Sequence, residues 1–237
     1  MLIPYSWLKE FVALRKPIEE VASDLSLSVI GVNGVETSGR EKVLNLDVTY
    51  NRGDLLSVAG VARELSAMYG FKLKEKEELF SPQEGGEHLR IKSRPQLAST
   101  YTLTRISGLS YKTTPKEIQS RLEAAGMRSV NLWADLTNYI MLAWGQPLHA
   151  FDAEKVARRD KTLSIEVRNA QRGETLRTLD GLDRNLTAQD IVIADRKGPI
   201  AIAGVMGGED TEVDEGTKEI FLEAAIFDPI SVRRTAR

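Results

Sequence analysis

Four short segments of this sequence carry side chains that could do chemistry. Arg128 supplies a guanidinium after a predicted helix end, and Thr137 with Asn138 supplies a polar helix face. His149 lies near Pro147, and the glycine-rich run at 203–208 is followed later in the chain by the carboxylate of Glu223. Together they could line one cleft that holds a polar ligand with backbone amides, an imidazole and a carboxylate. No Ser-His-Asp spacing or metal-ligand cluster is present, so a hydrolase of this kind would use a positioned water.

Each feature also has a plainer interpretation. Arg128 can simply neutralise the carbonyl groups at a helix end, and Thr137 with its neighbour can bond back to the preceding helical turn. His149 can be a loop histidine bonded to backbone. Glu223 can be an exposed carboxylate at a strand end, and the glycines at 203–208 can form a tight turn or bulge. The residues alone leave both sets of interpretations open.

The composition limits the kind of protein. The 237 residues are 42% hydrophobic and 28% charged with a net charge of −2, so we expect a packed core and no simple basic coat for nucleic acid. Cysteine is absent and the two histidines lie far apart, so no disulfide, thiolate or metal site is predicted. No apolar run approaches the roughly 20 residues of a membrane helix, and the chain does not start like a signal peptide. We expect a soluble, cytoplasmic protein.

The elements that position these segments are predicted from apolar periodicity. A helix capped by Thr114 should end at Gly126, and a second helix should cover 131–144. An alternating strand is expected over 43–50. Asp180-Gly181 should form a hairpin turn. Buried strands are expected after it, at 191–194, 199–203 and 220–222. This order predicts an α+β fold, with a small mixed α/β amino-terminal domain before a larger domain of mixed or antiparallel sheet and flanking helices.

A charged and turn-rich stretch marks the predicted domain boundary. Residues 74–87 are assigned to a linker on this composition. An amino-terminal domain at 1–73 precedes it and a larger domain at 88–237 follows it.

Several motifs resemble the β chain of bacterial phenylalanyl-tRNA synthetase. The resemblance is carried by DLTNY at 135–139, GQPLHAFD at 145–152, AGVMGGE at 203–209 and LEAAIFDP at 222–229. Segments at 6–9, 47–54 and 60–62 match the amino-terminal domain of that family. The resemblance therefore spans essentially the whole chain.

The resemblance implies that the second domain hydrolyses tyrosine wrongly attached to the tRNA for phenylalanine. An apolar pocket shaped for phenylalanine rejects an added hydroxyl only by roughly 10²-fold, so a second sieve is useful. The implied catalytic residues are His149, Glu223 and Arg128. The implied substrate-binding residues are Thr137, Asn138, Pro147, Gly204, Met206 and Gly207.

The resemblance also implies a role for each group. Glu223 would accept a hydrogen bond from the tyrosine hydroxyl, and His149 with Pro147 would shape the pocket around the amino acid and the ester. Arg128 and the polar helix face would contact the terminal adenosine or orient the water. The glycine-rich run at 203–208 would bring backbone close to the substrate where side chains would block it.

Two departures from the family pattern matter. The family usually inserts a tRNA-binding, OB-like domain, whereas here the chain runs almost directly through that site, near 37–42. The family also uses a segment beyond Arg237 in its editing pocket, so the domain at 88–237 is expected to be truncated at its carboxy-terminal end. The implied partners are the 3′ end of tRNA(Phe) and the synthetase α chain, with no membrane. No cofactor is expected in this chain, whereas the whole enzyme would use ATP and Mg²⁺.

Other hypotheses stay open beside an editing enzyme. The chain could be a non-catalytic fragment or shortened relative that binds aminoacyl-tRNA or the α chain without turnover, or a folded but inactive piece. In none of these cases is this piece alone expected to aminoacylate. Convergence of the implied catalytic residues would favour editing, whereas a Glu223 that faces bulk solvent would contradict it.

Overall fold

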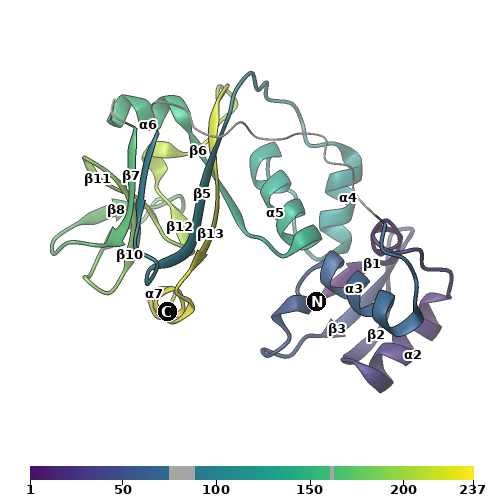
Figure 1. The fold of residues 1–237 in the computed structure, drawn as a ribbon. Helices are drawn as coiled ribbons and strands as arrows, with labels where there is room; N and C mark the ends of the chain where they lie inside the picture. The colour runs from purple at the N-terminus through teal and green to yellow at the C-terminus, as the bar shows by residue number, and fades with distance from the viewer. Residues whose placement is uncertain (75–88, 161–162) are drawn as a thin grey trace. The chain divides into compact units, whose positions relative to one another are not determined.

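The chain forms two compact units, each with its own core. The structure is a computed structural model that describes residues 1–74, 89–160 and 163–237. Unit 1 comprises Met1–Phe80 and Lys112–Pro147, and unit 2 comprises Ser81–Tyr111 and Leu148–Arg237. Helices and strands are both abundant, so the predicted α+β class is confirmed (Figure 1). The predicted linker at 74–87 lies, apart from Lys74, outside the described residues.

Unit 1 combines a small antiparallel sheet with helices. Its elements are β1 (Leu2–Pro4), α1 (Tyr5–Leu8), α2 (Ile18–Ser28), β2 (Gly31–Ser38), β3 (Glu41–Asp47), the 3-10 turn η1 (Gly53–Leu55), α3 (Val58–Tyr69), α4 (Lys116–Ala124) and α5 (Leu132–Trp144). The strand order is β1-β3-β2. Strands β2 and β3 are joined by a two-residue turn, in which Gly39 has φ +60°. The chain thus connects β2 directly to β3, near 37–42, where the resemblance implies that the family inserts a domain.

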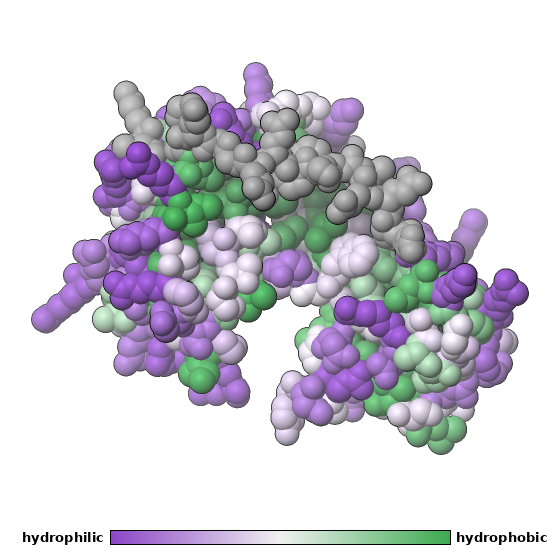
Figure 2. Space-filling model, in the orientation of Figure 1, coloured by the Kyte–Doolittle hydropathy of each residue, from purple (hydrophilic) through white to green (hydrophobic). Residues whose placement is uncertain are grey.

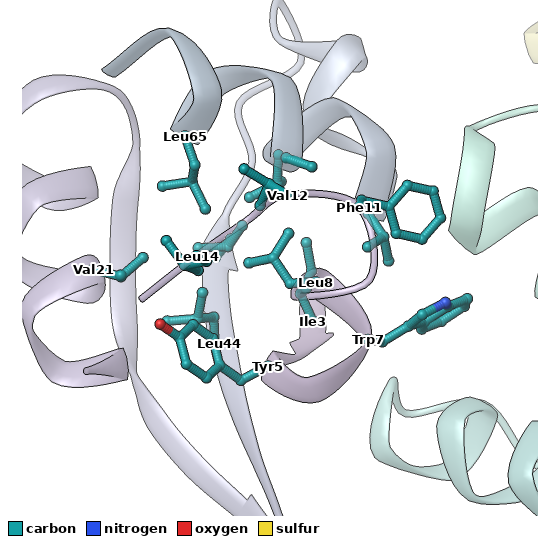
Figure 3. Packing of buried hydrophobic residues seen from close by; sticks show 14 of the residues in the cluster. Ile3, Tyr5, Trp7, Leu8, Phe11, Val12, Leu14, Val21, Leu44 and Leu65 are labelled. Carbon is teal, nitrogen blue, oxygen red and sulfur yellow. The ribbon is translucent and has the colours of Figure 1, made fainter. Parts of the chain in front are cut away.

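Helices α4 and α5 pack with the amino-terminal residues, although the predicted domains place them in the second half. Tyr139 of α5 stacks on Trp7 with ring centroids 4.7 Å apart, and Arg121 of α4 forms an ion pair with Glu10. Ala143 belongs to the same buried cluster as Trp7, part of which Figure 3 shows. The compact units therefore differ from the predicted domains at 112–147, because long-range packing assigns these helices.

Unit 2 is built from two sheets and a hairpin. Its elements are β4 (Arg90–Ser93), β5 (Ala98–Ile106), β6 (Leu148–Asp152), α6 (Ala153–Arg159), β7 (Ser164–Asn169), β8 (Thr175–Arg177), β9 (Asp183–Asn185), β10 (Ile191–Asp195), β11 (Gly198–Ile202), β12 (Met206–Gly207), the 3-10 turn η2 (Glu209–Thr211), β13 (Ile220–Phe227) and α7 (Pro229–Thr235). One sheet has the order β12-β11-β10-β7-β4 and the other β5-β13-β6, while β8 and β9 form the hairpin. In Figure 1 the long strand β13 runs beside β5.

The two sheets of unit 2 share one apolar core. Ile165, Ile193 and Ala201 from the larger sheet cluster with Phe151 and Phe221 from the smaller one. Alternation explains this arrangement, because every second side chain of a strand points to the same face. The inner face of the three-stranded sheet is therefore the face that carries Phe151 and Phe221.

Several predicted elements are confirmed and others need correction. The helix predicted over 131–144 is α5, capped by the Asn131 side chain, which accepts from the Ala134 N–H at 3.0 Å. The strand predicted over 43–50 ends at Asp47, and Tyr50 is fully exposed. The cap predicted at Thr114 is wrong, because α4 begins at Lys116 without a side-chain cap and the Thr114 hydroxyl donates to Asp135 instead.

The face of the molecule that Figure 2 shows is mostly hydrophilic. Figure 2 shows hydrophobic residues reaching the visible face in patches between polar ones. Large exposed apolar side chains include Leu27 and Ile230. None of the helices in the described ranges has the length and hydrophobicity that a membrane crossing requires.

Candidate functional site

Glu223 lies in the middle of β13 on the inner face of the three-stranded sheet. The predicted strand stops at Leu222, whereas β13 continues to Phe227, so the interpretation as a strand-end carboxylate is wrong. Glu223 pairs with Leu103 of β5 on one side and with His149 of β6 on the other. Directly opposed residues of antiparallel strands place their side chains on the same face. The register therefore brings the carboxylate and the imidazole together.

The Glu223 carboxyl is buried in mostly apolar surroundings. The residue is 6% exposed, and Oε2 accepts a hydrogen bond from the Tyr101 hydroxyl at 3.1 Å. Burial raises the pKa of Glu223 to about 7, against the smaller lowering effect of the Tyr101 hydrogen bond. Burial disfavours the charged form of a carboxyl, so this group changes its charge near neutral pH.

His149 is half-buried on strand β6, so its interpretation as a loop histidine is wrong. Its ring meets Phe151 edge-on, with ring centroids 4.6 Å apart. Burial lowers the pKa of His149 to about 4. The imidazole is therefore neutral at physiological pH, and it can accept or donate one hydrogen bond without adding charge to the site.

Gly207 of β12 packs directly on the His149 ring. A Cβ atom added at Gly207 would lie 2.5 Å from Cε1 and 2.6 Å from Nε2 of His149. Gly204 has a different reason to be glycine, because its φ is +67° and an added Cβ would meet Val232 at 3.1 Å and Phe227 at 3.3 Å. Of the predicted glycines, Gly207 thus borders His149, whereas Gly204 packs against Val232 and Phe227. Met206 precedes Gly207 in β12 and is half-buried.

We expect Gly207→Ala to displace the His149 ring. The new methyl group would overlap the imidazole, which already contacts Phe151, so the folded chain should lose about 1–3 kcal/mol from overpacking. A double-mutant cycle in urea unfolding checks this: the cost of Gly207→Ala should shrink by at least about 1 kcal/mol in a His149→Ala background. Equal costs in both backgrounds would contradict the contact.

The remaining predicted residues belong to unit 1. Arg128 is exposed and forms no ion pair within the described residues. The Thr137 hydroxyl donates to the carbonyl oxygens of Trp133 at 3.1 Å and Ala134 at 3.0 Å, which is the back-bonded arrangement of the plainer interpretation. Asn138 is half-buried in α5.

Pro147, the last residue of unit 1, is exposed and its carbonyl oxygen accepts from the Gln146 amide at 2.8 Å. Like the unit 1 residues Arg128, Thr137 and Asn138, it is not part of the cluster around Glu223 within unit 2. The substrate contacts of these four residues stay predictions.

Asp135, which begins the DLTNY motif, has a structural role in unit 1. It is fully buried and accepts hydrogen bonds from Thr114 at 2.6 Å, from Ser129 at 2.6 Å and from the Val130 N–H at 2.8 Å. Burial alone would raise the pKa of Asp135, but the three hydrogen bonds lower it below the usual value. The carboxylate thereby ties the loop before α5 to the segment before α4.

Tyr101 is the site residue that sequence reasoning missed. It lies 122 positions from Glu223 in the chain, and only the pairing of β5 with β13 brings the two together. Alternation over 98–106 could place Tyr101 on one strand face, but it carries no information about the partner strand. The described residues also contain no group of three or more His, Cys, Asp or Glu side chains that could hold a metal ion.

The arrangement suits recognition of a polar group inside an apolar environment. Glu223 offers an oxygen that accepts no hydrogen bond from the described residues, and His149 offers a neutral ring beside it. A ligand with one hydroxyl donor and a hydrolysable bond could use both side chains.

Comparisons with known proteins agree on one family. The family model described as the B3/4 domain matches residues 97–237. The phenylalanine–tRNA ligase β subunit of Carboxydothermus hydrogenoformans is 48% identical over 196 residues, which cover 82% of this chain and 24% of that protein. The β subunit of Trichormus variabilis is 46% identical over 201 residues, which cover 82% of this chain and 25% of that protein.

A relative from Rhodopirellula baltica is similar over the full chain. This phenylalanine–tRNA ligase β subunit is 40% identical over 242 residues, which cover 100% of this chain and 35% of that protein. An alignment of 242 positions over the 237 residues of this chain contains no insertion of domain size. This chain spans about a quarter to a third of the length of these curated relatives.

A solved structure has the same fold. It is an amino-terminal fragment of the phenylalanyl-tRNA synthetase β subunit from Pyrococcus horikoshii, with a TM-score of 0.51 and 16% sequence identity. The match covers 98% of this chain and 69% of that chain. At this identity the match supports the arrangement of elements alone.

Proposed function

The chain belongs to the B3/4 domain family, and from this membership we propose that it is part of a phenylalanine–tRNA ligase β chain whose unit 2 edits mischarged tRNA. The reaction is hydrolysis of the ester between tyrosine and tRNA(Phe). The 3′ end of that tRNA and the synthetase α chain are the proposed partners. ATP and Mg²⁺ would serve the ligase reaction of the whole enzyme and not this hydrolysis.

The observation that carries the proposal is the buried Glu223 carboxyl with one oxygen left unpaired by the described residues. A tyrosine hydroxyl would satisfy that oxygen, whereas a phenylalanine ring would leave it buried and unpaired. Leaving a buried polar group unpaired costs roughly 1–3 kcal/mol, or about 5- to 150-fold in preference. A polar second sieve of this kind complements an apolar first pocket that rejects an added hydroxyl weakly.

The proposed hydrolysis needs no protein nucleophile. A water molecule attacks the ester, and the neutral His149 ring orients the water or the ester beside Glu223. A base with a pKa of about 4 is weak at neutral pH, so His149 contributes mainly by position. The contributions proposed for Arg128, Thr137, Asn138 and Pro147 rest on the family resemblance alone.

Deacylation of tyrosyl-tRNA(Phe) and phenylalanyl-tRNA(Phe) tests this function. The wild-type chain should hydrolyse the tyrosyl ester faster, and Glu223→Gln should reduce that preference by at least about tenfold. His149→Ala should slow hydrolysis of the tyrosyl ester without reversing the preference. Rates are corrected for spontaneous hydrolysis in buffer.

Glu219→Gln is the matched control, because Glu219 precedes β13 and is held by a surface pair with Arg105 at 2.7 Å. This variant should keep the wild-type preference. An unchanged preference in Glu223→Gln would show that this carboxyl does not read the hydroxyl. No hydrolysis by the wild-type chain would leave the alternative of a non-catalytic piece that binds aminoacyl-tRNA or the α chain.

A further inference from the structure

Tyr101 places a phenol group of the protein itself against the Glu223 carboxyl. Its hydroxyl donates to Oε2 of Glu223 at 3.1 Å. The ring is half-buried and lies tilted against Phe227, with ring centroids 6.2 Å apart. The register Ala225↔Tyr101 places the ring on the same inner sheet face as Glu223. The strand pairing thus gives this hydroxyl a defined place beside the carboxyl.

The two oxygens of Glu223 are not equivalent. Oε2 is occupied by Tyr101, whereas Oε1 accepts no hydrogen bond from any residue in the described ranges. Because the Tyr101 hydroxyl already donates to Oε2, a ligand hydroxyl would donate to Oε1.

Resting on the proposed function, we propose that Tyr101 is a positioning residue for specificity: it holds Oε2 so that Glu223 presents Oε1 to an aminoacyl ester with a para-hydroxyphenyl ring. The Tyr101–Glu223 contact is itself a phenol donating to this carboxyl, so the geometry that a substrate phenol needs already exists in the fold. Rotation of the carboxyl would break this contact, and the hydrogen bond therefore fixes its orientation.

Burial is the largest influence on the charge of Glu223, and the hydrogen bond from Tyr101 opposes it. From β6 the neutral His149 faces Glu223, and from β5 Arg105 is already paired with Glu219. The side chains of the opposite sheet that share the core with Phe151 and Phe221 include Ile165, Val167, Ile191, Ile193 and Ala201. Removing the Tyr101 hydroxyl should therefore raise the pKa of Glu223, since a donor stabilises the ionised form.

Tyr101→Phe tests the proposal, because it deletes the hydroxyl and keeps the ring that packs on Phe227. The chain is labelled with ¹³Cδ-glutamate, and the Glu223 signal is identified by its loss in Glu223→Gln. In Tyr101→Phe the titration midpoint of Glu223 should move up by about one pH unit or more. The preference for the tyrosyl ester should fall about tenfold at pH 7 and recover at higher pH, with hydrolysis of the phenylalanyl ester unchanged.

Tyr69→Phe is the matched control, since Tyr69 donates to Asp24 at 2.7 Å in unit 1. It should leave both the Glu223 midpoint and the ester preference unchanged. If Tyr101→Phe does not fold, replacement of all tyrosines by the more acidic 3-fluorotyrosine serves instead. A stronger donor should then lower the Glu223 midpoint.

The outcomes separate this inference from the proposed function. An unmoved Glu223 midpoint overturns the positioning role, whatever the chain hydrolyses. A wild-type preference in Tyr101→Phe at pH 7 overturns the specificity role even if the midpoint moves. If the Glu223 titration midpoint moves but the chain hydrolyses neither ester, the result supports the positioning of Glu223 by Tyr101 and overturns the editing function.

Discussion

Gly60→Ala should be the most damaging single methyl addition in unit 1. Gly60 lies in the first turn of α3, and an added Cβ would sit 1.7 Å from the carbonyl oxygen and 2.8 Å from the carbonyl carbon of Asp54. The obstacle is backbone, so α3 would have to move away from η1. We expect this displacement to lower the free energy of unfolding by about 3 kcal/mol or more. The higher helix propensity of alanine than of glycine should offset about 1 kcal/mol of that loss.

Tryptophan fluorescence during urea unfolding measures this effect in unit 1 alone. The chain has 3 tryptophans, Trp7, Trp133 and Trp144, and all belong to unit 1. Gly53→Ala is the control, because its added Cβ would meet no atom within 4 Å. That variant should be neutral or more stable by about 0.4–1 kcal/mol. Equal midpoints for the two variants would mean that α3 tolerates displacement.

Glu223→Gln should make unit 2 more stable at pH 8 while it removes the ester preference. The pKa of Glu223 is about 7 in the folded chain, against an ordinary value of 4.5. The folded state therefore binds this proton more tightly than the unfolded state. The stability that the group contributes is fully present below pH 4.5 and is lost as pH rises through about 7.

Glutamine keeps an acceptor for the Tyr101 hydroxyl but carries no charge to desolvate. The expected gain in the free energy of unfolding is on the order of 3 kcal/mol at pH 8 and near zero at pH 4.5. Urea titration followed by the amide NMR signals of β5 and β13 measures it in unit 2. Glu219→Gln should show no gain that grows with pH. A gain from Glu223→Gln that is equal at both pH values would contradict a buried, ionisable carboxyl.

The wild-type profile contains an opposite contribution from His149, which the comparison of variants cancels. The pKa of His149 is about 4 against an ordinary 6.5, so the folded state binds this proton less tightly. Its contribution is present above pH 6.5 and is lost as pH falls through about 4. The stability of the wild-type chain should therefore change less between pH 4.5 and 6.5 than either group alone would cause.

The sequence by itself determined the local elements and the kinds of residue available for chemistry. The apolar runs predict β10 and β11, the Asp180-Gly181 pair predicts the turn between β8 and β9, and the apolar positions over 131–144 predict α5. These signals are local, because periodicity and turn chemistry act over a few neighbouring residues. The family motifs likewise identify Glu223 and His149 without any knowledge of their contacts.

Only the tertiary structure decided which of these residues meet. Pairing of β13 with β5 and β6 places Glu223 between Tyr101 and His149, and a shift of register by one residue would turn it to the other sheet face. Packing on Trp7 likewise assigns α5 to unit 1, although the chain order suggests the second domain. Both outcomes depend on contacts between residues far apart in the chain, from His149 and Glu223 to Trp7 and Tyr139, and no local pattern encodes such contacts.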